Sequence, residues 1–154
     1  MKIGLIGAGR LRLCFALLME RAGYTVIASD IREDYVNGLN EKRIDTNEPD
    51  VERLLSDSSK ITFTTNNWDI IEECDLIYTF VATPSTRDGD YDVSAVEKVV
   101  QDFTTSSSKL SGKSLVIGCT TNPGDCDKFK EQLPESVDVF YNPELLLKEL
   151  LLKI

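Results

Sequence analysis

The sequence predicts an α/β fold: a single-domain, Rossmann-type, doubly wound parallel sheet of about six strands. Short apolar runs rich in β-branched residues alternate with segments of helical spacing, a pattern typical of a parallel sheet with helices on both faces. The run at 76–81 is apolar with little alternation, as expected of a strand covered on both faces. Gly7 and Gly9 directly follow the first run, where such folds turn from strand to helix and bind phosphate.

The predicted elements follow one another along nearly the whole chain. Each strand is a run of apolar, β-branched or aromatic residues, and the six runs are 2–7, 24–30, 61–65, 75–83, 114–120 and 137–142. The segments between them have helical spacing, at 10–22, 33–40, 51–56, 69–73, 93–103 and 125–132. Pro84 ends the fourth strand, and no internal repeat or domain-sized linker is visible. We expect a Rossmann domain over 1–144 and an amphipathic helical tail over 145–154.

The composition is that of an acidic globular domain. The chain has 154 residues, enough for one domain with its own core, and it carries 17 Lys and Arg against 26 Asp and Glu, a net charge of −9. An acidic chain without a basic stripe is a poor partner for nucleic acid or an anionic membrane. No apolar stretch approaches the roughly 20 residues of a membrane span, and no signal-peptide pattern opens the sequence. We expect a cytoplasmic protein that binds neither nucleic acid nor membrane.

Histidine is absent and the four cysteines form no C-x-x-C pair. A zinc site is therefore not expected, and we predict no metal. The missing histidine also removes every Ser-His and Cys-His nucleophile pair, which excludes hydrolase triads. The cysteines are interpreted as small, mostly buried thiols of a reducing compartment.

The carboxyl ends of parallel strands form the ligand-binding edge of such a sheet. Here that rule selects 7–12, 30–32, 81–84 and 119–121. Asp30 closes the second predicted strand 23 residues after Gly7, where a carboxylate accepts hydrogen bonds from both hydroxyls of an adenine ribose. It also repels a 2′-phosphate, so the sequence favours NAD over NADP, although the nearby Arg32 opposes that preference.

Arg12 stands where the dinucleotide-binding fingerprint has its third glycine. That glycine mainly allows close packing of helix on strand. A long side chain there either pushes the helix outward or places its guanidinium at the helix edge, within reach of a phosphate. The alternative is that the glycine was replaced by neutral drift, at a site that is no longer required to bind a cofactor tightly. We expect binding to be retained but weakened, and tightened again by Arg12→Gly.

Five motifs in order resemble the N-terminal cofactor domain of the UDP-glucose (UDP-sugar) 6-dehydrogenase family, in a truncated and divergent form. The matching stretches are IGLIGAGRLRL, SDIREDYVNGLN with NEPDVERLL, FVATPS with DGDYDVSAVEKVV, VIGCTTNPGDCD and YNPELL. The family departs from this chain in having glycine at Arg12, often lysine at Tyr35, and proline at Asn122. The resemblance implies NAD as cofactor, for a reaction that oxidises a UDP-sugar hydroxymethyl group twice to a carboxylate.

The resemblance also implies the site residues. Those expected at the pyrophosphate, the ribose and the rest of the cofactor are Gly7, Ala8, Gly9, Arg10, Leu11, Asp30, Arg32, Val81, Ala82, Thr83 and Thr120. Thr120 and Glu144 match catalytic positions that order a water near the nicotinamide, and in this chain both are expected to be vestigial.

The family's enzymes are longer, and their nucleophilic cysteine, its assisting lysine and most of the UDP-binding surface lie in later domains. No cysteine here occupies the matching G-x-C context. We therefore expect a truncated, UDP-glucose 6-dehydrogenase-like protein that binds NAD(H) and is inactive alone on UDP-sugars. The alternatives are a part of a larger dehydrogenase assembly, an active small NAD-dependent dehydrogenase on another substrate, and an interaction module with an empty site.

The sequence ends LLLKELLLKI, where the family continues into a substrate loop with a Glu-Gly or Gln-Gly pair. We expect the chain to end naturally here; a piece cut from a longer protein with a divergent loop is the alternative. Leucines fill one side of this predicted helix and Lys148, Glu149 and Lys153 the other. Such a stripe packs on the protein's own core or supports a homo-oligomer.

Overall fold

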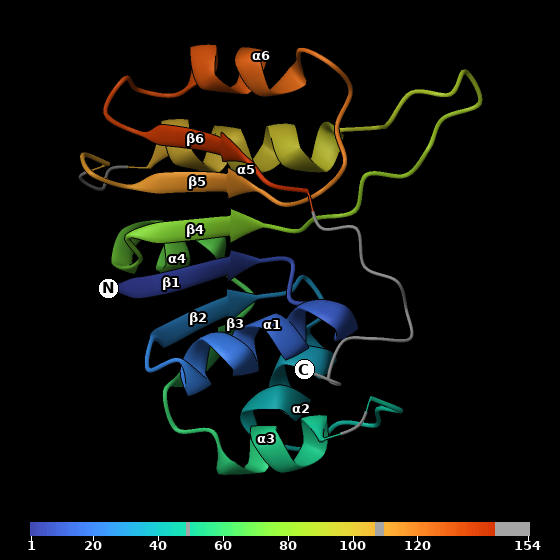
Figure 1. Ribbon diagram of the computed structural model, residues 1–154, viewed down its shortest axis with the longest axis vertical. Helices are drawn as coiled ribbons and strands as arrows, with labels where there is room; N and C mark the ends of the chain where they lie inside the picture. Colours follow the sequence, from blue (N-terminus) through green and yellow to red (C-terminus); the bar gives the residue numbers. More distant parts are fainter. Residues whose placement is uncertain (49, 107–109, 144–154) are drawn as a thin grey trace.

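The computed structural model describes residues 1–48, 50–106 and 110–143. Its sheet has six strands in the order β3-β2-β1-β4-β5-β6, and every neighbouring pair is parallel. The strands are β1 (Lys2–Ile6), β2 (Thr25–Ser29), β3 (Ile61–Thr64), β4 (Leu76–Thr79), β5 (Ser114–Ile117) and β6 (Asp138–Tyr141). The predicted doubly wound Rossmann fold is confirmed (Figure 1). Glu144 and the predicted tail at 145–154 lie outside the described residues.

Six helices connect the strands, each within a few residues of its predicted position. They are α1 (Arg10–Arg21), α2 (Glu33–Asn40), α3 (Val51–Asp57), α4 (Asn67–Glu73), α5 (Ser94–Thr105) and α6 (Asp125–Gln132). Within the described ranges, none of these helices is both long and apolar enough to cross a bilayer.

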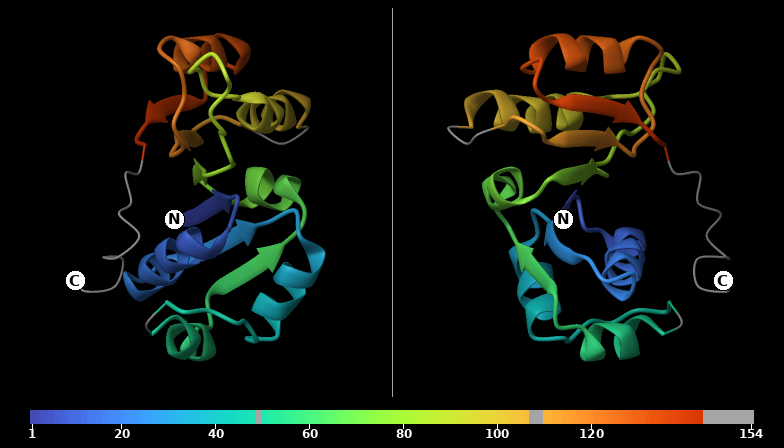
Figure 2. Two further views of the ribbon diagram at one scale, coloured as in Figure 1. Left: turned by 90° about the vertical axis from the view of Figure 1, so that its right-hand side faces the viewer. Right: turned by 60° about the vertical axis from the view of Figure 1, so that its left-hand side comes forward.

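The two faces of the sheet carry separate cores, because side chains alternate along each strand. On one face Ile3 and Leu5 of β1 pack with α1, α2 and α3. On the other, Ile6 of β1 and Ile77 of β4 pack with α4, α5 and α6. The views in Figure 2 show α1, in blue, and α5, in yellow, on opposite sides of the strands.

The fourth strand is shorter than predicted, ending at Thr79 rather than at residue 83. The segment that follows β1, the neighbour of β4, turns toward β2 after Ile6. There the backbone N–H groups of Gly7 and Ala8 both donate to the Ser29 carbonyl, at 2.9 and 2.7 Å. The Phe80 N–H still donates to the Ile6 carbonyl, at 2.7 Å, but the residues after Phe80 no longer have β1 beside them. They continue as a long loop, drawn in yellow-green, that extends from the carboxyl edge before α5 begins (Figure 1).

Gly7 makes this turn possible. Its φ is +94°, and a Cβ built on it would lie 2.9 Å from the carbonyl carbon and oxygen of Phe80. Only glycine tolerates both the left-handed backbone and so close an approach of another chain segment. The turn places the N-terminus of α1 at the carboxyl edge of the sheet.

Candidate functional site

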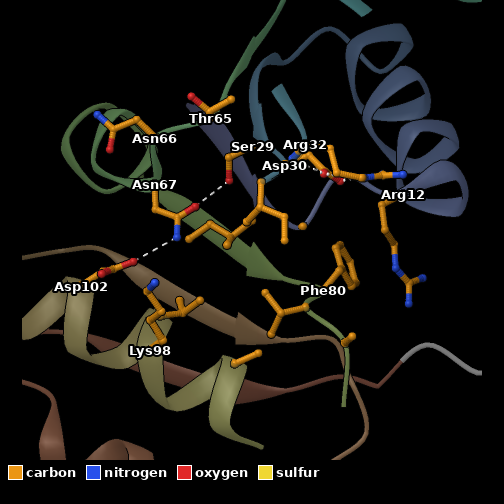
Figure 3. Close-up of a pocket in the computed structure, with 18 of the residues that line it drawn as sticks. Arg12, Ser29, Asp30, Arg32, Thr65, Asn66, Asn67, Phe80, Lys98 and Asp102 are labelled. Carbon is orange, nitrogen blue, oxygen red and sulfur yellow. Dashed lines mark hydrogen bonds and ion pairs between the residues drawn. The ribbon is translucent and has the colours of Figure 1, made fainter. Parts of the chain in front are cut away.

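A pocket of about 840 Å³ opens at the carboxyl edge of the sheet, beside β1, β2 and β4. Figure 3 shows the side chains around it. The residues that line it are Ile6, Gly7, Gly9, Arg12, Ser29, Asp30, Ile31, Arg32, Thr65, Asn66, Asn67, Trp68, Phe80, Val81, Ala82, Ala95, Lys98, Val99 and Asp102.

The N-terminus of α1 forms one end of the pocket. Gly9 caps the helix without a side-chain hydrogen bond, and the first turn carries no acidic residue. A Cβ built on Gly9 would meet no atom of the described residues within 4 Å, so there is open space beside Gly9 at this end of the pocket. The positive end of a helix dipole facing open space suits the phosphates of a dinucleotide.

Arg12 lies at the same end of the pocket. Its guanidinium carbon is 4.4 Å from the centre of the Phe80 ring, a cation–π distance. Helix α1 is well packed behind it, since Leu13 and Cys14 are buried in the core. The guanidinium thus lies at the edge of the helix (Figure 3). This was one of the two placements expected from the sequence, the other being a helix pushed outward.

At the end of β2, Asp30 and Arg32 form a two-point ion pair. Nε and Nη2 of Arg32 donate to Oδ1 and Oδ2 of Asp30, both at 2.9 Å, and the Arg32 backbone N–H donates to Oδ1 at 3.0 Å. Burial raises the pKa of Asp30, but these hydrogen bonds outweigh it and hold the pKa below its ordinary value of 3.8. The ionised carboxylate therefore persists throughout the neutral range.

A chain of polar side chains crosses the pocket from β2 to α5. The Ser29 hydroxyl donates to Oδ1 of Asn67 at 2.7 Å, and Nδ2 of Asn67 donates to Oδ2 of Asp102 at 3.0 Å (Figure 3). The chain fixes the amide of Asn67 and ties α4 to α5 across the opening. These groups give the far wall of the pocket a polar edge beside the apolar Val99.

Part of this lining consists of residues predicted from the sequence. Gly7, Gly9, Asp30, Arg32, Val81 and Ala82 line the pocket. Ala8 does not; it is buried, and its N–H donates to Ser29. Arg10 and Leu11 supply the first turn of α1. Thr83 and Thr120 follow β4 and β5 at the same edge but are not among the lining residues.

The lining residues that were not predicted are Ile6, Ser29 and Phe80, at or next to the strand ends, and two further groups. Residues 65–68 directly follow β3, and the carboxyl-edge rule that selected the other loops also applies to them. Ala95, Lys98, Val99 and Asp102 lie on one stripe of α5. Their helical spacing is visible in the sequence, but which face of α5 meets the pocket depends on how the helix packs.

The comparison with known families agrees with this geometry. The profile of the UDP-glucose/GDP-mannose dehydrogenase family, NAD binding domain, matches residues 1–153. The chain belongs to this family. NAD is accordingly the cofactor of the domain type that the chain represents.

Several curated proteins match nearly the whole chain. An uncharacterised protein of Methanocaldococcus jannaschii, MJ1054, is 35% identical over 95% of this chain and 16% of its own length. A Bacillus subtilis protein described as a putative UDP-glucose 6-dehydrogenase, YtcA, is 27% identical over 95% of this chain and 35% of its own length. This chain therefore spans about a third or less of these relatives.

Solved dehydrogenases share the fold. GDP-mannose dehydrogenase of Pseudomonas aeruginosa superposes with a TM-score of 0.83 at 23% identity, over 96% of this chain and 37% of that one. A UDP-D-ManNAc dehydrogenase of Pyrococcus horikoshii gives a TM-score of 0.82, also at 23% identity and over 37% of its own chain.

Cys119, the cysteine next to Thr120 in the sequence, is buried. Cys119 precedes Thr120, and burial raises the pKa of its thiol to about 11. Glu144, the other family position, lies outside the described residues. Among the residues that are described, no cluster of three or more Cys, Asp or Glu side chains could hold a metal ion.

Proposed function

We propose that this chain is a nucleotide-binding domain that takes up NAD(H) in the carboxyl-edge pocket and does not by itself complete UDP-sugar oxidation. The N-terminus of α1, which faces the pocket and has no side-chain hydrogen bond at its cap residue Gly9, carries the proposal. It supplies the anion site, with Gly7 forming the turn and Gly9 leaving room for the pyrophosphate.

The remaining lining residues suit the rest of the dinucleotide. Asp30 would accept the adenosine ribose hydroxyls at the end of β2. Ile31 lines the pocket with 95% of its surface exposed, and burying this side chain against a nucleobase would remove apolar surface from water. Val81, Ala82 and Thr83 would run beside the cofactor. When bound, NAD supplies a nicotinamide ring that accepts a hydride.

Thr120 and Glu144 are assigned, by family position alone, to a vestigial water network. A thiol with a pKa of about 11 is almost wholly protonated at neutral pH, so Cys119 is a poor nucleophile. The chain thus lacks an activated thiol at this edge for the covalent route of the longer enzymes. This supports cofactor binding without turnover.

Calorimetric titration with NAD and NADH tests the proposal. We expect saturable binding by the parent protein and a loss of at least about tenfold, or roughly 1.4 kcal/mol, in Gly9→Val. The Cβ of the added side chain would lie in open space, and its methyl groups are meant to occupy the proposed phosphate position. The free energy of unfolding should therefore change little. Absence of NAD binding by the folded parent, or unchanged binding in Gly9→Val, would contradict the assignment.

Two further expectations are proposed from the sequence alone: a cytoplasmic location, and self-association through the apolar stripe of residues 145–154. Sedimentation velocity of the parent and a Leu150→Lys variant would test the second. A parent monomer at high concentration would count against it.

A further inference from the structure

The ion pair at the end of β2 bears on which dinucleotide the pocket accepts. We propose that Arg32 makes the ribose site tolerant of a 2′-phosphate, so that the chain binds NADP nearly as well as NAD. The inference rests on the proposed dinucleotide site and specifies its ligand.

Asp30 is already engaged by Arg32 before any ribose arrives. Oδ1 accepts two N–H groups of Arg32 and Oδ2 accepts one. A carboxylate offers about four acceptor positions, and the Asp30 side chain is only 8% exposed. The two ribose hydroxyls must therefore compete with Arg32 for this carboxylate, which weakens the usual advantage of an unphosphorylated ribose.

Arg32 in turn has donors to spare. A guanidinium carries five N–H groups, and two of them are given to Asp30. Its side chain is 53% exposed, and the guanidinium carbon lies 4.3 Å from the centre of the Tyr35 ring. The ring and the carboxylate hold the guanidinium at the pocket, where its remaining N–H groups match the fork geometry that phosphate oxygens accept.

The charge of the lining removes the usual obstacle to a second phosphate. Asp30 alone would repel a 2′-phosphate, but its partner Arg32 cancels that charge. Arg12, Arg32 and Lys98 against Asp30 and Asp102 give the lining a formal charge of 3 − 2 = +1, whereas the whole chain carries −9. The side chains that line the pocket thus carry a net positive formal charge although the whole chain is acidic, which favours an added phosphate.

Titrations of NAD and NADP into the parent, Arg32→Ala and Arg53→Ala test the proposal. Arg53 is a matched control, because it forms an exposed ion pair with Asp50 at 3.0 Å outside the pocket. We expect the two dissociation constants of the parent to differ by less than about tenfold, with NAD the tighter ligand. Arg32→Ala should weaken NADP by about tenfold or more and leave NAD equal or tighter. Arg53→Ala should change neither.

Asp30→Ala supplies the opposite change. It should weaken NAD more than NADP, because only the ribose hydroxyls need the carboxylate as acceptor. If the parent binds NAD but not NADP, or if Arg32→Ala weakens both ligands equally, the inference is overturned and the proposed function stands. If the folded parent binds neither dinucleotide, the proposed function itself fails. Circular dichroism of each variant verifies that it is folded.

Discussion

At the residue scale, the most informative position is Arg12, which departs from the glycine of the fingerprint. The sequence suggested that glycine would restore a close contact between helix and strand. In the structure Leu13, Cys14 and Leu17 of α1 are buried in the core, so the helix packs on the sheet with Arg12 in place. The guanidinium lies over Phe80, at the end of the pocket formed by the N-terminus of α1. Its positive charge is therefore the property of Arg12 that matters to an anionic ligand.

We predict that Arg12→Gln, which keeps much of the side-chain length, weakens NAD binding by about three- to tenfold, the worth of one charge-assisted contact. The loss should shrink as salt is raised, because added ions screen a partly exposed charge. Titrations at low and high ionic strength measure both effects, with Arg53→Ala again as the charge-matched control. Tighter binding in Arg12→Gln would restore the first interpretation, in which the long side chain hinders the cofactor.

At the scale of elements, the side chain of Phe80 packs at the carboxyl ends of β4 and β5, where it also lines the pocket. Phe80 follows β4, stacks on Tyr78 at 5.7 Å and meets the edge of Phe15 at 5.5 Å. Its ring lies over Gly118, just after β5: a Cβ built on Gly118 would be 2.2 Å from Cε1 of that ring. The absence of a side chain at 118 therefore leaves the space that the Phe80 ring occupies beneath Arg12.

We predict that Gly118→Ala lowers the free energy of unfolding by about 1–3 kcal/mol, because the ring is buried and held on several sides, so the added methyl group overpacks the core. Urea denaturation measures the loss. Adding Phe80→Leu should recover part of it, since the smaller side chain vacates the space that the methyl group needs, and this coupling is the specific signature of the contact. Equal stability of Gly118→Ala and the parent would show that the ring moves aside freely.

At the scale of the whole molecule, the pocket lies at the carboxyl edge of the sheet, and the thiol that follows β5 at this edge, Cys119, is buried and has a raised pKa. We predict no steady NADH formation with saturating NAD and UDP-glucose, because covalent oxidation through a thiohemiacetal needs a thiolate. Absorbance of NADH measures this, and Cys119→Ala should give the same flat trace. Steady turnover that disappears in Cys119→Ala would make the chain a minimal enzyme.

The pH dependence of thiol labelling provides an independent check on the same cysteine. Burial raises the pKa of Cys119 from its ordinary value of 9.0 to about 11, so the thiolate forms only as the pH rises toward that value. Labelling of Cys119 in the folded protein should remain slow at pH 7–9 and accelerate above it, as followed by mass spectrometry. Rapid labelling at pH 7 would reveal an activated thiol.

The sequence alone was enough for the order of the elements, the glycine turn and the position of Asp30. Strand and helix periodicity are local properties, and the carboxyl ends of parallel strands meet at one edge whichever strands are neighbours. Gly7, Gly9, Asp30 and Val81 could therefore be assigned to one pocket before any contact was known. Their spacing along the chain carried that information.

The tertiary structure decided which side chains face one another across that edge. The packing of α4 and α5 brings Asn67 between Ser29 and Asp102. The same packing places Lys98 of α5 at the pocket. Side-chain conformations within the folded pocket decide that Arg32 pairs with Asp30 and that the Arg12 guanidinium lies over the Phe80 ring. Periodicity specifies which face a residue occupies, whereas the partner it meets there is set by long-range packing, where segments far apart in sequence come together.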